Sequence, residues 1–231
     1  MITARSLSDL VYEELLRQIV AGELRSGCLL REPQLASQLG VSRTPVREAL
    51  TRLAEDELLE IRPNRSAMVR HLGREELLHI YQVREALEGL AAELACGRLT
   101  ASDYARLKRL AAAAQDEAAA NYMAACHAFD VELHRLVGLR SGNPVLARQI
   151  EQFHTVVHLV RERIGNQDGA LALTYRQHLD ILAALKAGDP AASRRAMTNH
   201  IRTSCAFAVR GVADQAAAPA AAENQKQVLI G

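Results

Sequence analysis

The chain has 231 residues, of which 49% are hydrophobic and 24% are charged. This composition supports a buried core and excludes a wholly disordered chain, and the length predicts one or two domains. Lys and Arg number 28 against 27 for Asp and Glu, so the net charge of +1 lacks the basic excess typical of duplex DNA-binding proteins. Arg outnumbers Lys 25 to 3. Two explanations are open for this excess: a need for bidentate Arg contacts, or the base composition of the genome.

Several classes of protein are disfavoured by what the chain lacks. Aromatic residues make up 3%, with no Trp, which argues against binding single-stranded nucleic acid by stacking. The four cysteines are far apart and form no Cys-x-x-Cys motif, which argues against a cysteine-based zinc site. No apolar run approaches the ~18 residues of a membrane span, and the first residues are charged and amphipathic, unlike a signal peptide. We therefore expect a cytoplasmic protein without a membrane partner.

The first predicted elements are three helices. Apolar residues recur at three- and four-residue spacing over 7–20, which indicates an amphipathic helix. A short helix over 34–39 ends at Gly40. The third runs to about residue 55, with Ser42 or Thr44 as its cap and Pro45 in its first turn.

Two β-prone runs follow, at 58–62 and 67–70, and a turn at 63–66 joins them into a predicted hairpin. Helix, short helix, helix and hairpin is the order of a winged helix-turn-helix. We assign residues 1–70 to this DNA-binding domain and residues 71–74 to a linker.

The rest of the chain reads as helices, so the predicted fold class is mainly α. Asn143-Pro144 and Asp189-Pro190 are start signals, in which a capping residue precedes a proline. An all-helical domain is expected over 75–210, and the Ala-rich residues 211–231 are expected to be a disordered tail. The predicted helices cover 75–96, 101–120, 122–139, 144–164, 170–187 and 190–210.

The third helix has the two faces that a DNA-reading helix needs. Val46 and Leu50 lie on one face and can pack on a core, whereas Arg43, Arg47 and Thr51 are spaced by four and line another. Arg can donate two hydrogen bonds to a guanine edge or bind phosphate. On spacing alone, a solvated charged face is an equally good interpretation.

Charge segregation favours DNA binding. The first helix is acidic, whereas residues 61–70 carry Arg62, Arg65 and Arg70 and no acid. Arg65 at the hairpin tip is placed to enter a minor groove, where narrow A-tracts attract Arg.

The run LASQLGVSRTPVREAL, from Leu35 to Leu50, resembles the GntR family of bacterial transcription regulators. The resemblance implies that Arg43 and Arg47 contact operator DNA and that Thr44 bonds to backbone phosphate. The sequence departs from the family pattern at three positions: Pro33 replaces the usual Arg, Glu57 replaces the Gly after the recognition helix, and Ser66 replaces the Gly of the wing tip. These departures put the wing contacts and the half-site sequence in question. Pro33 cannot contact bases, so either Arg31 takes over this contact or the contact is missing. The predicted DNA-binding residues are Arg31, Ser42, Arg43, Thr44, Arg47 and Arg65.

Four residues of the helical domain form a candidate metal site. Asp130 and His134 are four apart on one helix and can point at one ion, and His178 and His200 lie on two later helices. Spacing alone is weak evidence here, because His154 and His158 make a competing pair.

Residues 75–210 resemble the FCD type of GntR effector domain, through YQVREALE from Tyr81, FDVELHRLV from Phe129, and the segments around His178 and His200. The resemblance implies that Asp130, His134, His178 and His200 bind a divalent metal ion, with zinc preferred and nickel or manganese as alternatives. It also implies a small organic-acid effector whose carboxylate pairs with an Arg. Arg84 matches this position, and a structural salt bridge with Glu85 or Glu88 is the alternative interpretation.

The predicted function is a ligand-responsive transcription regulator that is not an enzyme. A homodimer would bind double-stranded operator DNA, and a carboxylate metabolite at the metal-centred pocket would change its affinity, with repression as the expected sign. A metal-ion sensor without an organic effector is the alternative. A metal-dependent hydrolase is a weaker one, because no general base is apparent beside the site.

Overall fold

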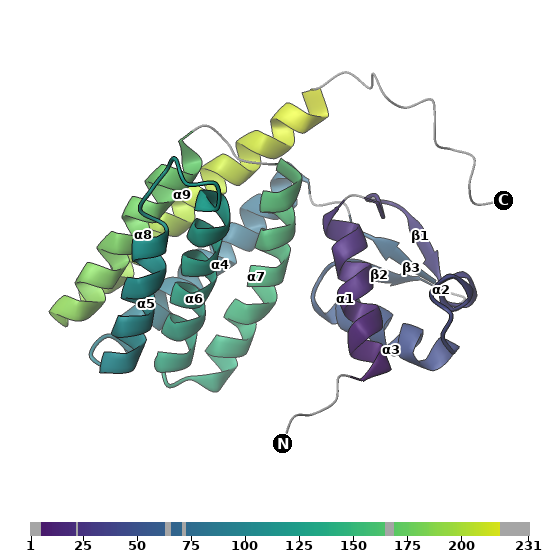
Figure 1. The fold of residues 1–231 in the computed structure, drawn as a ribbon, viewed down its shortest axis with the longest axis horizontal. Helices are drawn as coiled ribbons and strands as arrows, with labels where there is room; N and C mark the ends of the chain where they lie inside the picture. The colour runs from purple at the N-terminus through teal and green to yellow at the C-terminus, as the bar shows by residue number, and fades with distance from the viewer. Residues whose placement is uncertain (1–5, 22, 63–65, 71–72, 165–168, 218–231) are drawn as a thin grey trace.

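The structure is a computed structural model that describes residues 6–21, 23–62, 66–70, 73–164 and 169–217. Two units follow one another along the chain (Figure 1). The first combines three helices with a small antiparallel sheet of strand order β1-β3-β2, and the second is a helical bundle. The elements of the first unit are α1 (Leu7–Val20), β1 (Leu29–Arg31), α2 (Glu32–Leu39), α3 (Arg43–Glu55), β2 (Leu59–Arg62) and β3 (Ser66–Val69).

Apolar periodicity explains why α1 and α3 pack together. Leu15 of α1 and Val46 and Leu53 of α3 are fully buried in one core, while the opposite faces of both helices carry charge. Strand β3 lies between its neighbours, pairing Leu30 with Ala67 on one side. The unit is therefore a winged helix-turn-helix, as predicted, with the hairpin as its wing.

The second unit is a bundle in which α4 and α9 pack along most of their lengths, with α8 beside α9 and α6 between α5 and α7. Its helices are α4 (Arg74–Ala95), α5 (Ala101–Ala113), α6 (Tyr122–Arg140), α7 (Pro144–Ile164), α8 (Ala170–Ala187) and α9 (Pro190–Ala217). The predicted caps of α7 and α9 are confirmed: Asn143 Oδ1 accepts bonds from the amides of Val145 and Leu146, and Asp189 accepts one from Ala192. Within the described part of the chain, no helix combines the length and apolar character needed to cross a bilayer.

The first unit differs from the sequence-based expectation at three places. Strand β1 was not anticipated, because three residues between a turn and a helix carry no periodic signal of their own. Helix α2 begins at Glu32 rather than residue 34. Ser42 occupies the N-cap of α3 but its side chain makes no capping bond, and Thr44 lies inside the helix.

The second unit differs at two helix ends. Helix α5 ends at Ala113 instead of residue 120, and the side chain of Asp116 then bonds the amide of Ala118 in a turn. The tail prediction was wrong for 211–217, because α9 continues to Ala217 and Val212 packs against the core. Ala has the highest helix propensity, which favours helix in this Ala-rich segment, and the packing of Val212 adds tertiary stabilisation to the last turns of α9. The remaining tail, 218–231, lies outside the described residues.

Candidate metal centre and nucleic-acid interface

Helix α3 presents the predicted polar residues to solvent. Val46 and Leu50 are buried, which orients the helix, while Arg43, Thr44 and Arg47 are exposed on the other side. Arg43 forms no hydrogen bond or ion pair with another described residue, so its guanidinium is available to a partner. The two faces inferred from spacing are thus present in the fold.

Arg47 is held in place by an acid from the preceding helix. Its Nε and Nη2 donate to Oε1 and Oε2 of Glu32, both at 3.0 Å, in the fork geometry that only Arg can adopt. The side chain of Glu32 is 6% exposed and that of Arg47 is 50% exposed. The hydrogen bonds that Arg47 donates to Glu32 raise the pKa of Arg47 and keep it charged. The sequence did not predict this partner, because spacing along one helix says nothing about an acid on another helix.

The other predicted DNA-binding residues are distributed around this pair. Arg31 is exposed at the end of β1, and Ser42 is exposed just before α3. Arg65 lies outside the described residues.

The departures from the family pattern have local structural explanations. Pro33 occupies the first turn of α2, where its missing N–H has no helical partner. Glu57 has φ +61°, the left-handed region where the family's usual Gly is unstrained, and its carboxylate pairs with Arg70. Ser66 is the first residue of β3. Glu57 therefore adopts the backbone conformation for which glycine is normally used.

The four predicted metal-site residues come together from three directions in the bundle. Helix α6 contributes Asp130 and His134, α8 contributes His178, and α9 contributes His200; all four are buried. His200 Nε2 is 3.2 Å from the Nε2 atoms of both His134 and His178. Asp130 Oδ1 is 3.0 Å from His178 Nε2 and 3.6 Å from His134 Nε2.

These four atoms fit a divalent cation. Ligand atoms about 2.1 Å from an ion are about 3.0 Å apart at neighbouring octahedral corners and about 3.4 Å apart in a tetrahedron. The observed separations of 3.0–3.6 Å span both values. Three imidazole nitrogens facing one point cannot all satisfy one another, whereas a cation satisfies every lone pair. The donor set of three nitrogens and one carboxylate oxygen suits zinc, nickel or manganese.

Charged neighbours orient two of these ligands. Glu88 of α4 bonds His134 Nδ1, which leaves Nε2 free to face the centre. Arg161 of α7 donates from Nη1 to Asp130 Oδ2 at 2.6 Å, which leaves Oδ1 facing the centre. The sequence suggested Glu88 only as a partner of Arg84, and no sequence signal pointed to Arg161.

Burial and charge set the protonation of the centre. Burial lowers the pKa of His134 and lowers that of His200 well below its usual value, which favours the neutral imidazole that binds metal. For Asp130, burial alone would raise the pKa, but Arg161 and His178 hold it well below the usual range. Burial therefore favours the neutral imidazole at His134 and His200, beside an ionised carboxylate at Asp130.

Arg84 lies away from solvent and is already paired. Its side chain is 1% exposed, and Nε and Nη2 bond Glu88 Oε1 at 2.8 and 2.7 Å. The guanidinium also lies 5.0 Å from the ring centroid of Tyr81. The salt bridge with Glu88, one of the two interpretations of Arg84, is present, and the direct role with an effector stays a prediction.

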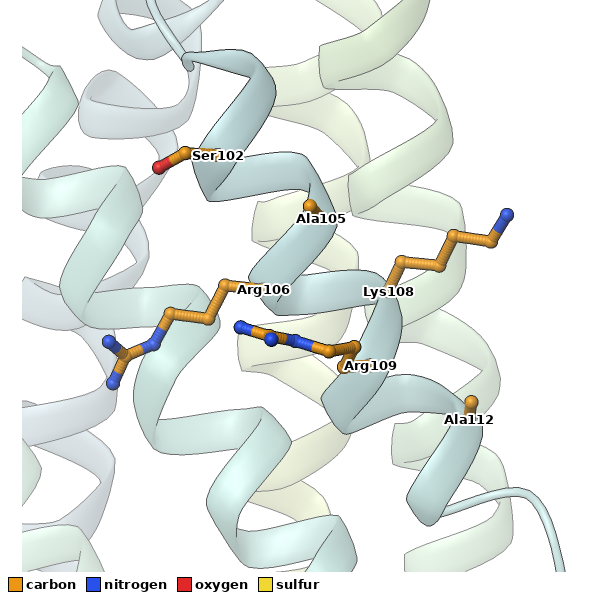
Figure 2. A pocket seen from close by; sticks show the side chains of 6 residues that line it. All are labelled: Ser102, Ala105, Arg106, Lys108, Arg109 and Ala112. Atoms are coloured by element: carbon orange, nitrogen blue, oxygen red, sulfur yellow. The ribbon is translucent and has the colours of Figure 1, made fainter.

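An open hollow elsewhere on the bundle is a separate feature. It covers about 610 Å³ over α5, where Ser102, Ala105 and Ala112 lie beside Arg106, Lys108 and Arg109 (Figure 2). Its lining contains no histidine or acid, and Arg106 pairs with Glu132 of α6. The hollow therefore offers no metal ligands and is a solvated basic surface.

Comparison with known proteins agrees with both units. Residues 7–69 match the model of the bacterial regulatory proteins of the gntR family, and residues 79–203 match the FCD domain. The chain belongs to the GntR family, with an FCD domain. As a GntR regulator it is a DNA-binding transcription regulator rather than an enzyme.

Individual relatives match most of the length of this chain. This GntR regulator is 32% identical over 214 residues to the HTH-type transcriptional regulator McbR of Escherichia coli, covering 87% of this chain and 92% of McbR. It is 31% identical to a probable D-xylose utilization operon transcriptional repressor of Paenarthrobacter nicotinovorans, covering 87% and 88%. The solved structure of E. coli McbR aligns with a TM-score of 0.73 at 29% identity, covering 90% of this chain and 99% of that one.

Proposed function

We propose that this regulator senses a small carboxylate at a metal-centred pocket in its FCD domain and changes its affinity for operator DNA in response. The observation that carries the proposal is the convergence of Asp130, His134, His178 and His200 on one point inside a domain attached to a DNA-binding unit. When bound, the ion supplies a positive charge that attracts a carboxylate.

The DNA side of the proposal rests on α3 and the residues beside it. Two recognition helices of a homodimer enter successive major grooves of a pseudo-palindromic operator, with Arg43 and Arg47 at base edges or phosphates and Thr44 and Ser42 at phosphates. Arg31 and Arg65 add contacts from the strand end and the wing. The near-zero net charge is consistent with a large share of binding coming from placed Arg contacts.

The link between the two sites runs through α7. This helix carries Arg161, which contacts Asp130, and it also contacts α1 of the DNA-binding unit (Figure 1). A ligand that moves Arg161 therefore acts on a helix in contact with the DNA-binding unit. The effector favours one arrangement of the two units through differential binding, and release from the operator is the expected sign.

A gel-shift assay with operator DNA and a thermal-shift screen of small carboxylic acids, each with and without chelator, test the proposal. Arg43→Ala abolishes the shifted band while the protein stays folded. A carboxylic acid that stabilises the protein only with metal present supports the effector model. Stabilisation by the ion alone, with no acid adding to it, supports the metal-ion sensor instead.

Elemental analysis tests the centre separately. About one equivalent of metal per chain is expected, following the single four-ligand site. The double variant His134→Ala with His178→Ala should lose it, and full occupancy in that variant would refute the site.

A further inference from the structure

One side chain connects the two units of the chain. Arg70 follows directly after β3, and its Nη2 bonds Glu76 Oε1 in the first turn of α4. Its Nη1 bonds the carboxylate of Glu57, in the turn after α3, and also donates to the Glu57 carbonyl oxygen at 3.2 Å. The guanidinium therefore holds the DNA-binding unit on one side and the helical bundle on the other.

The bridge of Glu57, Arg70 and Glu76 consists of two linked ion pairs. The side chains of Arg70 and Glu76 are 28% and 29% exposed, so water and salt screen their attraction only in part. The planar guanidinium presents donors to both acids at once, which the compact ammonium of a Lys cannot do in a fixed geometry. The backbone N–H of Arg70 also donates to Leu58 O at 3.0 Å. Arg70 is thus anchored on the DNA-binding unit at the point from which it reaches the bundle.

The backbone at Glu57 marks the same place. Its φ is +61°, a region uncommon for a residue with a Cβ, and no other non-glycine residue among those described has a positive φ. Unfavourable conformations of this kind persist where the surrounding structure holds them, and they gather at functional sites. The Glu57 N–H donates to Ala54 O at 3.0 Å, so this turn continues directly from α3. The bridge is therefore attached to the end of the recognition helix.

A second contact between the units makes the bridge a constraint on their orientation. The units also touch where α1 meets α7 (Figure 1). A single contact leaves two bodies free to rotate about it, whereas a second attachment on another helix removes much of that freedom. The bridge supplies this attachment on α4. Together the two contacts fix the position of α3 relative to the bundle.

We infer that Arg70 is a positioning residue that sets the spacing at which the regulator reads the two half-sites of its operator. The inference rests on the proposed function, since two half-sites are read by a homodimer. With each α3 held on its own bundle, the distance between the two recognition helices cannot adapt freely to the DNA. One extra base pair between the half-sites moves them apart by about 3.4 Å and turns them by about 35°. Binding at the wrong spacing therefore requires the bridge to open.

The test uses the full chain and a duplex that the chain itself selects from a random DNA library. The inverted repeat of that duplex is resynthesised with one or two base pairs added or removed between its half-sites, and fluorescence anisotropy gives the Kd of each. The wild-type chain should bind the altered duplexes at least about tenfold more weakly, which corresponds to about 1.4 kcal/mol. This ratio, the spacing penalty, compares duplexes within one variant, so general changes of charge cancel.

Arg70→Gln, Glu76→Gln and Glu57→Gly each break the bridge, and each should reduce the spacing penalty to less than about threefold. Glu75→Gln is the matched control. Glu75 lies in the same turn of α4, is exposed and forms no ion pair with another described residue, so this variant loses the same charge as Glu76→Gln and should keep the full penalty.

Glu57→Gly separates positioning from stability. Glycine adopts φ +61° without strain, so this variant should unfold close to the wild-type temperature and still lose the spacing penalty. A residue that only stabilised the fold would leave the penalty unchanged. Equal penalties in the wild type and all three bridge variants, or no penalty in the wild type, would overturn the inference and leave the proposed function standing. A library that yields no bound duplex would overturn the proposed function and the inference with it.

Discussion

Glu32 and Arg47 form two parallel hydrogen bonds, from Nε to Oε1 and from Nη2 to Oε2, each 3.0 Å long. The acid is nearly buried and the Arg is half exposed, so Glu32 fixes the direction of a side chain that faces outward. Fixing this side chain before DNA arrives reduces the conformational entropy lost on binding.

The first prediction concerns this pair. Glu32→Gln removes one acceptor oxygen and the charge, so Arg47 loses its fixed orientation. We expect the ratio of operator affinity to nonspecific affinity to fall about tenfold, and fluorescence anisotropy with both DNAs at one salt concentration measures it. The ratio is the proper readout because removal of an acid raises nonspecific affinity. Glu48→Gln, at an exposed position of α3 next to Arg47, is the control, and an equal ratio in the two variants would contradict the role of Glu32.

A second prediction concerns how His134 is oriented. Glu88→Gln weakens the bond to His134 Nδ1 and should lower metal affinity by about 10- to 100-fold, as carboxylates behind metal-binding histidines do elsewhere. A competition titration with a chromogenic chelator measures the affinity. Glu85→Gln changes a neighbouring acid that pairs with Arg202 at the surface, and it should leave the affinity unchanged. If both variants bind metal equally well, Glu88 does not orient the ligand.

The pH dependence of the metal-free protein gives a third prediction. Burial lowers the pKa values of His134 and His200 below the ordinary 6.5, so the unfolded state binds more protons just below that pH. Stability therefore rises with pH in this window and is lost as the pH falls below about 6.5, by up to about 1.4 kcal/mol per pH unit for each extra proton. Urea unfolding with chelator at pH 7.5 and 5.5 measures the loss, and His200→Gln should reduce it. An equally large loss of stability in the His200→Gln variant would show that His200 does not contribute to the pH dependence.

Close packing between α4 and α9 supplies a fourth prediction. A Cβ built on Gly89 lies 2.7 Å from Thr198 Cγ2, so Gly89→Ala should destabilise the protein by about 1–3 kcal/mol in thermal or urea unfolding. Thr198→Ser removes that methyl and keeps the hydroxyl that bonds Arg195 O, so it should restore stability in the double variant.

Gly138→Ala is the matched control for Gly89. Gly138 lies inside α6, and a Cβ added there would be 3.6 Å from Ala147 Cα, an ordinary van der Waals contact. Since Ala is the better helix former, this variant should be neutral or more stable by up to about 1 kcal/mol. Equal effects at the two glycines would show that the α4–α9 contact is not tight.

The sequence by itself determined the two units, the order of most elements and the four candidate ligands that meet inside the bundle. Local chemistry carried that information: 3.6-residue periodicity placed most helices, Asn143-Pro144 and Asp189-Pro190 marked two starts, and the family motifs identified the two domains. The errors fell where local signals are weak or absent. Strand β1 exists only through its pairing with β3, and α9 extends past residue 210 because Val212 finds a core to pack on.

The tertiary structure alone decided which charges meet. Glu32 and Arg47 belong to different helices, and Asp130 and Arg161 to two neighbouring ones, so no spacing rule within one helix brings them together. Arg84 is a contrasting case: helical i, i+4 spacing already favours Glu88 over the adjacent Glu85, and tertiary packing decided only that this pair is buried. A charged side chain inside a core takes the partner buried beside it, because an unpaired charge there is too costly, and burial depends on packing between helices rather than on sequence order.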